Sequence, residues 1–146
     1  MTPMPRHPTT PPIGLRLTRT ARVAATAFER AMAEAGSSAA VFQVLVLVRS
    51  GEWGTQAGMA EAMGITGATL THHLNAMEAR GLVRRWREAS NRRVQRVELT
   101  DAGAALFDRL RRVAMRHDAR LRAKLSAAEA AQLAALLDKV EAGLAG

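Results

Sequence analysis

The chain has 146 residues, carries a formal net charge of +8 and contains no cysteine, which excludes disulfides, thiolate metal ligands and thiol-based redox switches. Its length suffices for one domain with a hydrophobic core, and no uncharged apolar stretch approaches the ~20 residues that span a bilayer. The excess positive charge is almost all arginine, which favours a nucleic-acid partner because guanidinium groups bind phosphate, although a genome-wide bias towards arginine codons gives the same composition.

Residues 1–14 are predicted to form a flexible arm. They contain all 5 prolines of the chain, and proline lacks the amide donor and favours extended backbone. An arm that reaches across a partner subunit is the alternative interpretation. Because no apolar run typical of a signal peptide occurs there, we expect a cytoplasmic protein without a membrane partner, with a single domain over residues 15–146.

Two apolar segments follow the arm. Residues 15–35 are predicted to form a helix that ends at Gly36, because apolar side chains recur there every three or four residues. The members of this stripe are Leu17, Ala21, Ala24, Phe28, Ala31 and Ala35. Residues 41–48 are apolar on all sides, and their β-branched content is compatible with a buried strand as well as with a buried helix.

A helix-turn-helix is predicted from residue 56 to about residue 80. Gly64 ends the first short helix, and Thr66 is suited to cap the second because its hydroxyl accepts an otherwise unpaired amide N–H. The second helix stops at Gly81. Its inward face carries Leu70, His73, Leu74 and Met77, and its opposite face carries Ala68, Thr71, His72 and Asn75.

A β-hairpin is predicted next, because residues 82–86 and 94–99 are strand-like and an arginine-bearing polar loop joins them. Thr100 then caps a long helix, and a capping box at residues 126–129 starts the last one. The apolar stripe of the long helix is Leu106, Leu110, Val113, His117 and Leu121, and that of the last helix is Leu133, Leu136, Leu137, Val140 and Leu144.

Short motifs occur in a fixed order along this part of the chain. They are Thr55-Gln56, Gly64-Ile65-Thr66, Met77-Glu78-Ala79-Arg80-Gly81-Leu82-Val83, Asn91-Arg92-Arg93 and Leu99-Thr100-Asp101-Ala102-Gly103. Each is weak by itself, but together, at this spacing, they resemble the MarR family of bacterial regulators. The sequence departs from the family at Asn91, where an aspartate typically pairs with the wing arginine. Because an amide forms no salt bridge, we expect Arg93 to be held less firmly.

The resemblance implies a fold that is mainly α with a small β-wing, and it favours a helix for residues 41–48. It also implies a homodimer held by the N-terminal and the two C-terminal helices. Residues 15–49 and 100–146 would then form a helical dimerisation region that includes the buried helix, and residues 50–99 a winged helix-turn-helix lobe that binds double-stranded DNA.

Regulators of this kind often bind a small aromatic or phenolic acid between the dimer helices and the DNA-binding lobe, and they then leave their operator. The resemblance therefore predicts a ligand-responsive repressor of an inverted-repeat operator. His117 and Phe28 are the candidate ligand-binding residues, with packing at the subunit interface as the alternative role of His117.

The candidate DNA contacts lie on the second helix of the helix-turn-helix and on the wing. They are Thr66, Ala68, Thr69, Thr71, His72 and Asn75 on the helix, and Arg84, Arg85, Arg87, Arg92, Arg93 and Arg96 on the wing. The helix is expected to enter the major groove, the tip arginines 92 and 93 the minor groove, and the other arginines to contact phosphates. The competing interpretations are a plain helix cap for Thr66 and a solvated charged surface for the wing.

Other functions find little support in the sequence. His72 and His73 point about 100° apart on a helix and cannot readily chelate one metal, so His73 is interpreted as a core histidine. We predict no metal, no cofactor and no enzyme, since the motifs of nucleophile elbows and phosphate loops are missing. The alternative function is a dimeric winged-helix scaffold for protein interactions without sequence-specific DNA binding.

Overall fold

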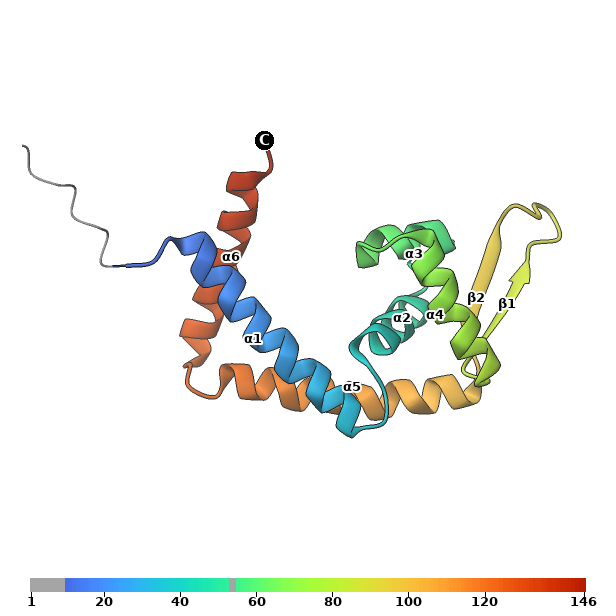
Figure 1. Cartoon of the computed structure of the whole chain (residues 1–146), viewed down its shortest axis with the longest axis horizontal. Coiled ribbons are helices and arrows are strands. Elements are labelled where there is room, and N and C mark those ends of the chain that lie inside the picture. Colours follow the sequence, from blue (N-terminus) through green and yellow to red (C-terminus); the bar gives the residue numbers. More distant parts are fainter. Residues whose placement is uncertain (1–9, 53–54) are drawn as a thin grey trace, which may run out of the picture.

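The computed structural model describes residues 10–52 and 55–146, and it has the predicted fold class. The elements are α1 (Ile13–Glu34), α2 (Ala39–Ser50), α3 (Gln56–Met63), α4 (Gly67–Ala79), β1 (Val83–Arg87), β2 (Gln95–Leu99), α5 (Asp101–Arg122) and α6 (Ala127–Leu144). Helix α5 forms a long base that α1 crosses, with α2, α3, α4 and the hairpin near one end and α6 rising at the other (Figure 1).

The apolar segment from residue 41 to 48 is a helix, α2, and not a strand. The Ser38 side chain starts it by accepting the Val41 amide at 3.2 Å, and Gly51 ends it with a left-handed φ of 66°. Val44 and Leu45 are fully buried, so α2 runs through the core. Trp53, a candidate packing residue at the base of the hairpin, lies outside the described residues.

The helix-turn-helix and its predicted cap at Thr66 are confirmed, and the structure adds a second cap at Thr55. Thr55 accepts the Gly58 amide at 3.2 Å and so starts α3, and Thr66 accepts the Thr69 amide at 3.1 Å and so starts α4. Between them Gly64 adopts a φ of 65°, which a side chain rarely tolerates. The inward residues of α4 are buried as predicted at Leu70, Leu74 and Met77, whereas His73 is only half-buried.

The wing is an antiparallel hairpin of β1 and β2, in a register that pairs Val83 with Leu99 and Arg87 with Gln95. Alternation along β1 places Val83 and Arg85 on the same face. Val83 is buried there, so Arg85 is directed towards the body of the lobe, and the intervening Arg84 lies on the opposite face.

Two of the predicted helix stripes need correction. In α1, Ala21 is exposed, and Met32, which lies outside the predicted stripe, is completely buried. The reason is that only the C-terminal part of α1 lies close to the α2–α5 core, and this crossing brings Met32 inward. In α5, Leu121 is 52% exposed because the helix runs beyond the core at this end.

Helix α6 begins at the predicted capping box, in which Ser126 and Glu129 bond each other's backbone amides. Its apolar stripe is nevertheless uncovered within the described chain, and none of its residues is buried. Leu133, Leu136, Leu137 and Leu144 are 40–83% exposed.

In the described ranges no single helix has the length and apolar composition of a membrane span. Helices α1 and α2 have this length and apolar composition only when they are taken together, and the chain bends by 85° between them.

Candidate nucleic-acid interface

The N-terminus of α4 presents polar groups to solvent. The Thr66 hydroxyl accepts the Thr69 amide and also lies 2.9 Å from the Thr69 hydroxyl, and both side chains are exposed. The first amides of a helix and its dipole create a positive potential at this end. Thr66 is therefore a cap whose surroundings suit an anion such as phosphate.

The outward face of α4 continues from this end. Ala68, His72 and Asn75 are exposed, whereas Thr71 is half-buried. The rings of His72 and His73 have centroids 6.1 Å apart and are tilted by 59°. Within the described ranges, no three histidine, aspartate or glutamate side chains come together in a way that could hold a metal ion. The exposed face of α4 offers the amide of Asn75 and the imidazole of His72 for contacts.

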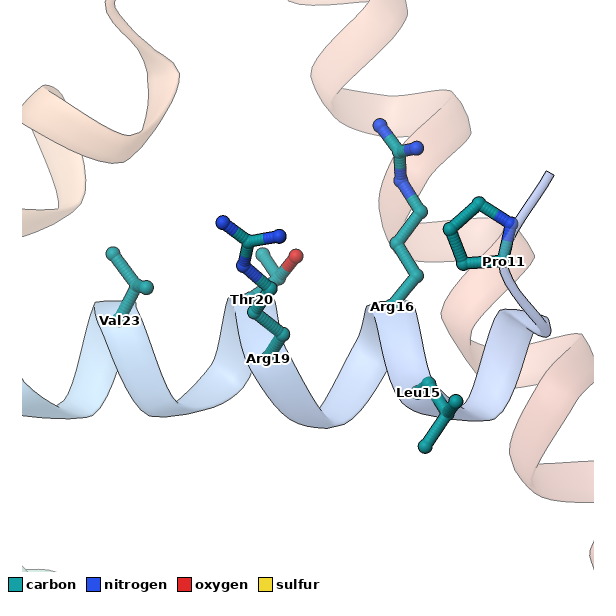
Figure 2. Close-up of a pocket in the computed structure, with 6 residues that line it drawn as sticks. All are labelled: Pro11, Leu15, Arg16, Arg19, Thr20 and Val23. Carbon is teal, nitrogen blue, oxygen red and sulfur yellow. The ribbon is translucent and has the colours of Figure 1, made fainter. Parts of the chain in front are cut away.

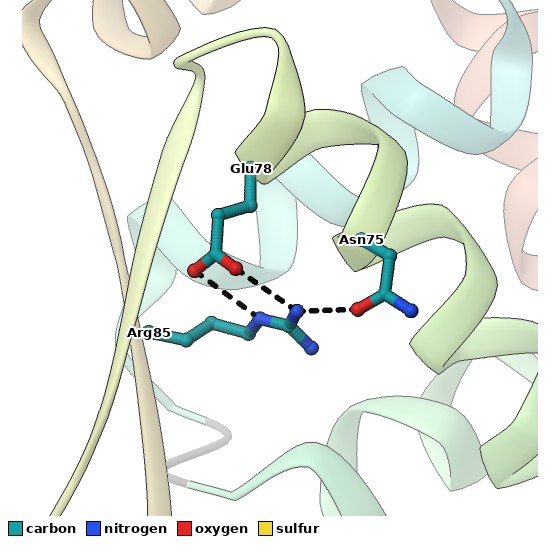
Figure 3. Close-up of polar contacts among 3 residues, drawn as sticks. All are labelled: Asn75, Glu78 and Arg85. Atoms are coloured by element: carbon teal, nitrogen blue, oxygen red, sulfur yellow. Dashed lines mark hydrogen bonds and ion pairs between the residues drawn. The ribbon is translucent and has the colours of Figure 1, made fainter.

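Arg85, one of the candidate phosphate contacts, is mostly buried. Its side chain is only 12% exposed and reaches from β1 back to α4, where it bonds Glu78 and Asn75 (Figure 3). Arg85 Nη2 lies 3.1 Å from Glu78 Oε1, and Arg85 Nε lies 3.5 Å from Glu78 Oε2. The hydrogen bond from Arg85 holds the pKa of the Glu78 carboxyl below its ordinary value. Sequence analysis quoted Glu78 as part of a motif and assigned it no role.

Three other wing arginines are also tied to the hairpin. Arg84 pairs with Glu98 across the strands, and Arg96 Nε lies 2.6 Å from Glu88 Oε1. Arg87 donates to the carbonyl oxygen of Arg92 at 2.9 Å and so braces the tip. The pairs are solvent-exposed, so they hold the guanidinium groups only loosely and leave part of each on the surface.

The tip of the wing carries exposed Arg92 and Arg93. Asn91 Oδ1 accepts the backbone amide of Arg93 at 3.2 Å, and the Asn91 carbonyl accepts the Val94 amide at 3.0 Å. Asn91 therefore shapes the backbone of the tip rather than binding the guanidinium of Arg93. Within the described chain the Arg92 and Arg93 guanidinium groups have no carboxylate partner, which leaves their charge available.

The candidate ligand residues Phe28 and His117 are in contact, with ring centroids 5.1 Å apart. His117 Nδ1 is buried and has no hydrogen-bond partner in the described chain. His117 also lines an open hollow of about 450 Å³ between α1 and α5. Two cationic residues that sequence analysis missed, Arg116 and Arg120, line the same hollow together with Glu34. Arg120 lies three residues after His117 on the same helix, and this spacing is the signal that could have identified it.

A second hollow of about 450 Å³ lies on α1 (Figure 2). Its lining residues are Pro11, Leu15, Arg16, Arg19, Thr20 and Val23. It is an open surface formed by one helix and the segment before it, so it is a feature of an uncovered helix face and not an enclosed binding cavity.

A capped helix-turn-helix followed by an arginine-rich hairpin, mounted on long helices, defines a winged helix-turn-helix protein. The family model that describes the MarR family matches residues 38–94. The transcriptional repressor CouR, solved bound to a 23-mer DNA duplex, is 30% identical, with a TM-score of 0.80 over 89% of this chain and 92% of CouR. The chain therefore belongs to the MarR family of winged helix-turn-helix transcription regulators, a family of regulators and not of enzymes.

Two further solved structures are similar. CouR from Rhodococcus jostii RHA1 bound to p-coumaroyl-CoA matches with a TM-score of 0.76 and 25% identity, over 89% of this chain and 92% of CouR. A mutant of MarR from E. coli complexed with operator DNA matches with a TM-score of 0.79 and 24% identity, over 89% of this chain and 94% of MarR. At this identity, the match to MarR supports the fold.

Proposed function

We propose that the protein is a homodimeric repressor that binds an inverted-repeat operator and is released from it by a small ligand. The observation that carries the proposal is the exposure of polar and cationic groups on α4 and on the wing that follows it. The exposed N-terminus of α4 is available for DNA, and so are the guanidinium groups of Arg92 and Arg93, which have no carboxylate partner among the described residues. We expect the protein to act in the cytoplasm, at the nucleoid when bound to DNA.

The proposed DNA contacts divide by groove. Thr66 and Thr69 contact phosphates or thymine methyl groups, whereas Ala68, Thr71, His72 and Asn75 face base edges in the major groove. Arg92 and Arg93 enter the minor groove, whose negative potential attracts guanidinium groups. Arg84, Arg87 and Arg96 contact phosphates after exchanging or sharing their partners on the hairpin. Arg85 differs from the others because α4 already holds it.

The proposed dimer contact is formed by the ends of the chain. The exposed apolar residues of α1 and of the α5 end are Ile13, Leu15, Val23 and Leu121, and they add to the uncovered stripe of α6. An apolar surface of this kind is typical of a contact between proteins. We accordingly propose residues 15–49 and 100–146 as the dimerisation region and residues 50–99 as the DNA-binding lobe. Most of the predicted arm of residues 1–14 lies outside the described residues, and its last two residues, Ile13 and Gly14, belong to α1.

The proposed ligand site is the hollow beside His117. His117 supplies an aromatic surface and contacts Phe28, which lies outside this lining, and the buried Nδ1 of His117 lacks a partner in the described chain. Arg116 and Arg120 supply two positive charges and Glu34 one negative charge, so the lining carries a net positive charge. These features suit a small aromatic or phenolic acid. The hollow lies between α1 and α5, the helices that connect the proposed dimer contact to the DNA-binding lobe. A bound acid there would change the separation of the two α4 helices, and it would weaken both half-site contacts together.

Selection from a random pool of duplex DNA at two salt concentrations tests this function. We expect an inverted repeat whose half-sites lie about one helical turn (about 34 Å) apart. Binding without a sequence preference that disappears as the salt concentration rises would leave only non-specific electrostatics. No binding even at low salt would contradict the proposal and would favour the dimeric interaction scaffold.

A further inference from the structure

The contact between Asn75 and Arg85 joins α4 to strand β1 of the wing. Asn75 lies on the exposed face of α4, one helical turn before Glu78, and Arg85 extends from β1 towards both residues (Figure 3). Arg85 Nη2 donates to Asn75 Oδ1 as well as to Glu78 Oε1. With only 12% of its side chain exposed, Arg85 has little freedom to leave this position.

The chemistry of the contact determines how Asn75 is oriented. A guanidinium group has five N–H donors and no acceptor, so only the carbonyl oxygen of the Asn75 amide can face it. The Asn75 Nδ2 group then points away from Arg85, as Figure 3 shows. An unconstrained asparagine offers a donor and an acceptor side by side, which is the pattern that pairs with adenine N6 and N7. Here Arg85 uses one of the two lone pairs of the Asn75 carbonyl oxygen and turns this acceptor towards β1.

We propose that Arg85 is a positioning residue that sets the base preference of Asn75, an inference that rests on the proposed DNA-binding function. Held in this way, Asn75 presents two N–H donors to the major groove. Guanine offers two acceptors there, O6 and N7, whereas adenine offers one acceptor and one donor. The wild-type protein therefore favours guanine over adenine at the position that Asn75 reads.

A purely structural role is the competing explanation. Arg85 and Glu78 join α4 to β1, and this ion pair stabilises the junction of the two elements whether or not Asn75 contacts DNA. A structural role alone predicts that loss of Arg85 weakens binding to every sequence equally. A positioning role predicts a change in the order of base preference, which loss of stability does not produce.

The test first identifies the operator position whose base preference changes in Asn75→Ala. Affinities are then measured for four duplexes that carry each of the four base pairs at that position. For the wild type we expect guanine to be favoured over adenine by about tenfold. In Arg85→Met the released amide pairs with adenine, so the ratio shifts towards adenine by about tenfold. The matched control Arg84→Met removes the same charge from the other face of β1, and it should weaken binding to all four duplexes by the same factor.

A second variant decides the question if Arg85→Met does not fold. Asn75→Asp still accepts from Arg85 but presents no donor, so it should lose the preference for guanine. Retention of that preference in Asn75→Asp, or an equal loss across the four duplexes in Arg85→Met, would overturn the inference. It would also be overturned if Asn75→Ala changed no base preference of a wild type that binds specifically. A wild type without any base preference would instead refute the proposed function, and this inference with it.

Discussion

Gly103 on α5 lies directly against the backbone of Leu82, so closely that a Cβ atom at position 103 would be 2.0 Å from the Leu82 carbonyl oxygen. The same carbonyl accepts the Thr100 amide at 3.1 Å, and the Thr100 hydroxyl donates to the Gly81 carbonyl at 2.5 Å. The start of α5 is thus fastened to the start of the wing. This contact explains why the Leu-Thr-x-x-Gly motif ends in glycine.

Gly103→Ala is expected to destabilise the protein. Because the obstructing atoms belong to backbone, α5 or the hairpin must move, which costs about 1–3 kcal/mol of unfolding free energy. Chemical denaturation monitored by circular dichroism measures this loss. Gly67→Ala is the matched control, since position 67 is also helical and a Cβ there meets nothing within 4 Å. Equal stability of the two variants would show that the contact is looser than described.

The ion pair of Glu78 and Arg85 makes stability depend on pH. Arg85 lowers the pKa of Glu78 in the folded state, so the pair stabilises the fold above the ordinary pKa of the carboxyl. This contribution is lost as the pH falls through about 4 and below. In Glu78→Gln we therefore expect a shallower decrease of the melting temperature in acid than in the wild type.

Glu61→Gln provides the control for this prediction. Glu61 is exposed on α3 and has no ion pair in the described part of the chain. Its replacement should leave the acid profile of the wild type unchanged. If both variants show the same profile as the wild type, the Glu78–Arg85 pair does not contribute to stability in solution.

Local signals made much of this fold predictable. Helix ends are set by residues that act on groups only a few positions away, so the residue types themselves identify these ends. Examples are the caps Thr66, Thr100 and Ser126 and the turn glycine Gly64. The strands of the wing were predicted from two short strand-like runs on either side of a polar loop. The MarR resemblance then settled the one ambiguous segment, α2.

The features that sequence analysis missed depend on how elements dock. Arg85 was expected on a phosphate-facing surface, but the register of the hairpin turns it towards α4 and so towards Asn75. Met32 is buried because of the place where α1 crosses the core, which periodicity within α1 does not encode. For α6 the apolar periodicity was predicted, but none of its residues is buried within the described chain, and in the proposed dimer a second copy would cover this stripe.

Leu137→Glu is expected to yield a monomer. It introduces a charge into the apolar stripe of α6, which is exposed in the single chain and covered in the proposed dimer. Sedimentation should show a loss of dimer, and circular dichroism should show retained helix, since no residue of α6 is buried within the chain. Gln132→Glu places the same charge on an exposed polar position of α6 and should leave the dimer intact. A dimeric Leu137→Glu would place the subunit contact elsewhere.

Arg93→Ala is expected to weaken DNA binding without affecting stability. The Arg93 side chain is exposed at the wing tip, and only its backbone amide is bound, by Asn91, so alanine preserves the shape of the tip. Loss of one guanidinium contact should lower the affinity for DNA by about tenfold. It should also reduce the number of counterions released on binding, measured from the salt dependence of the affinity, by about one. Fluorescence anisotropy with an operator duplex at several salt concentrations measures both effects. Arg30→Ala removes an exposed charge of α1, away from the proposed interface, and should change neither. If the two variants bind equally, the wing tip does not contact DNA.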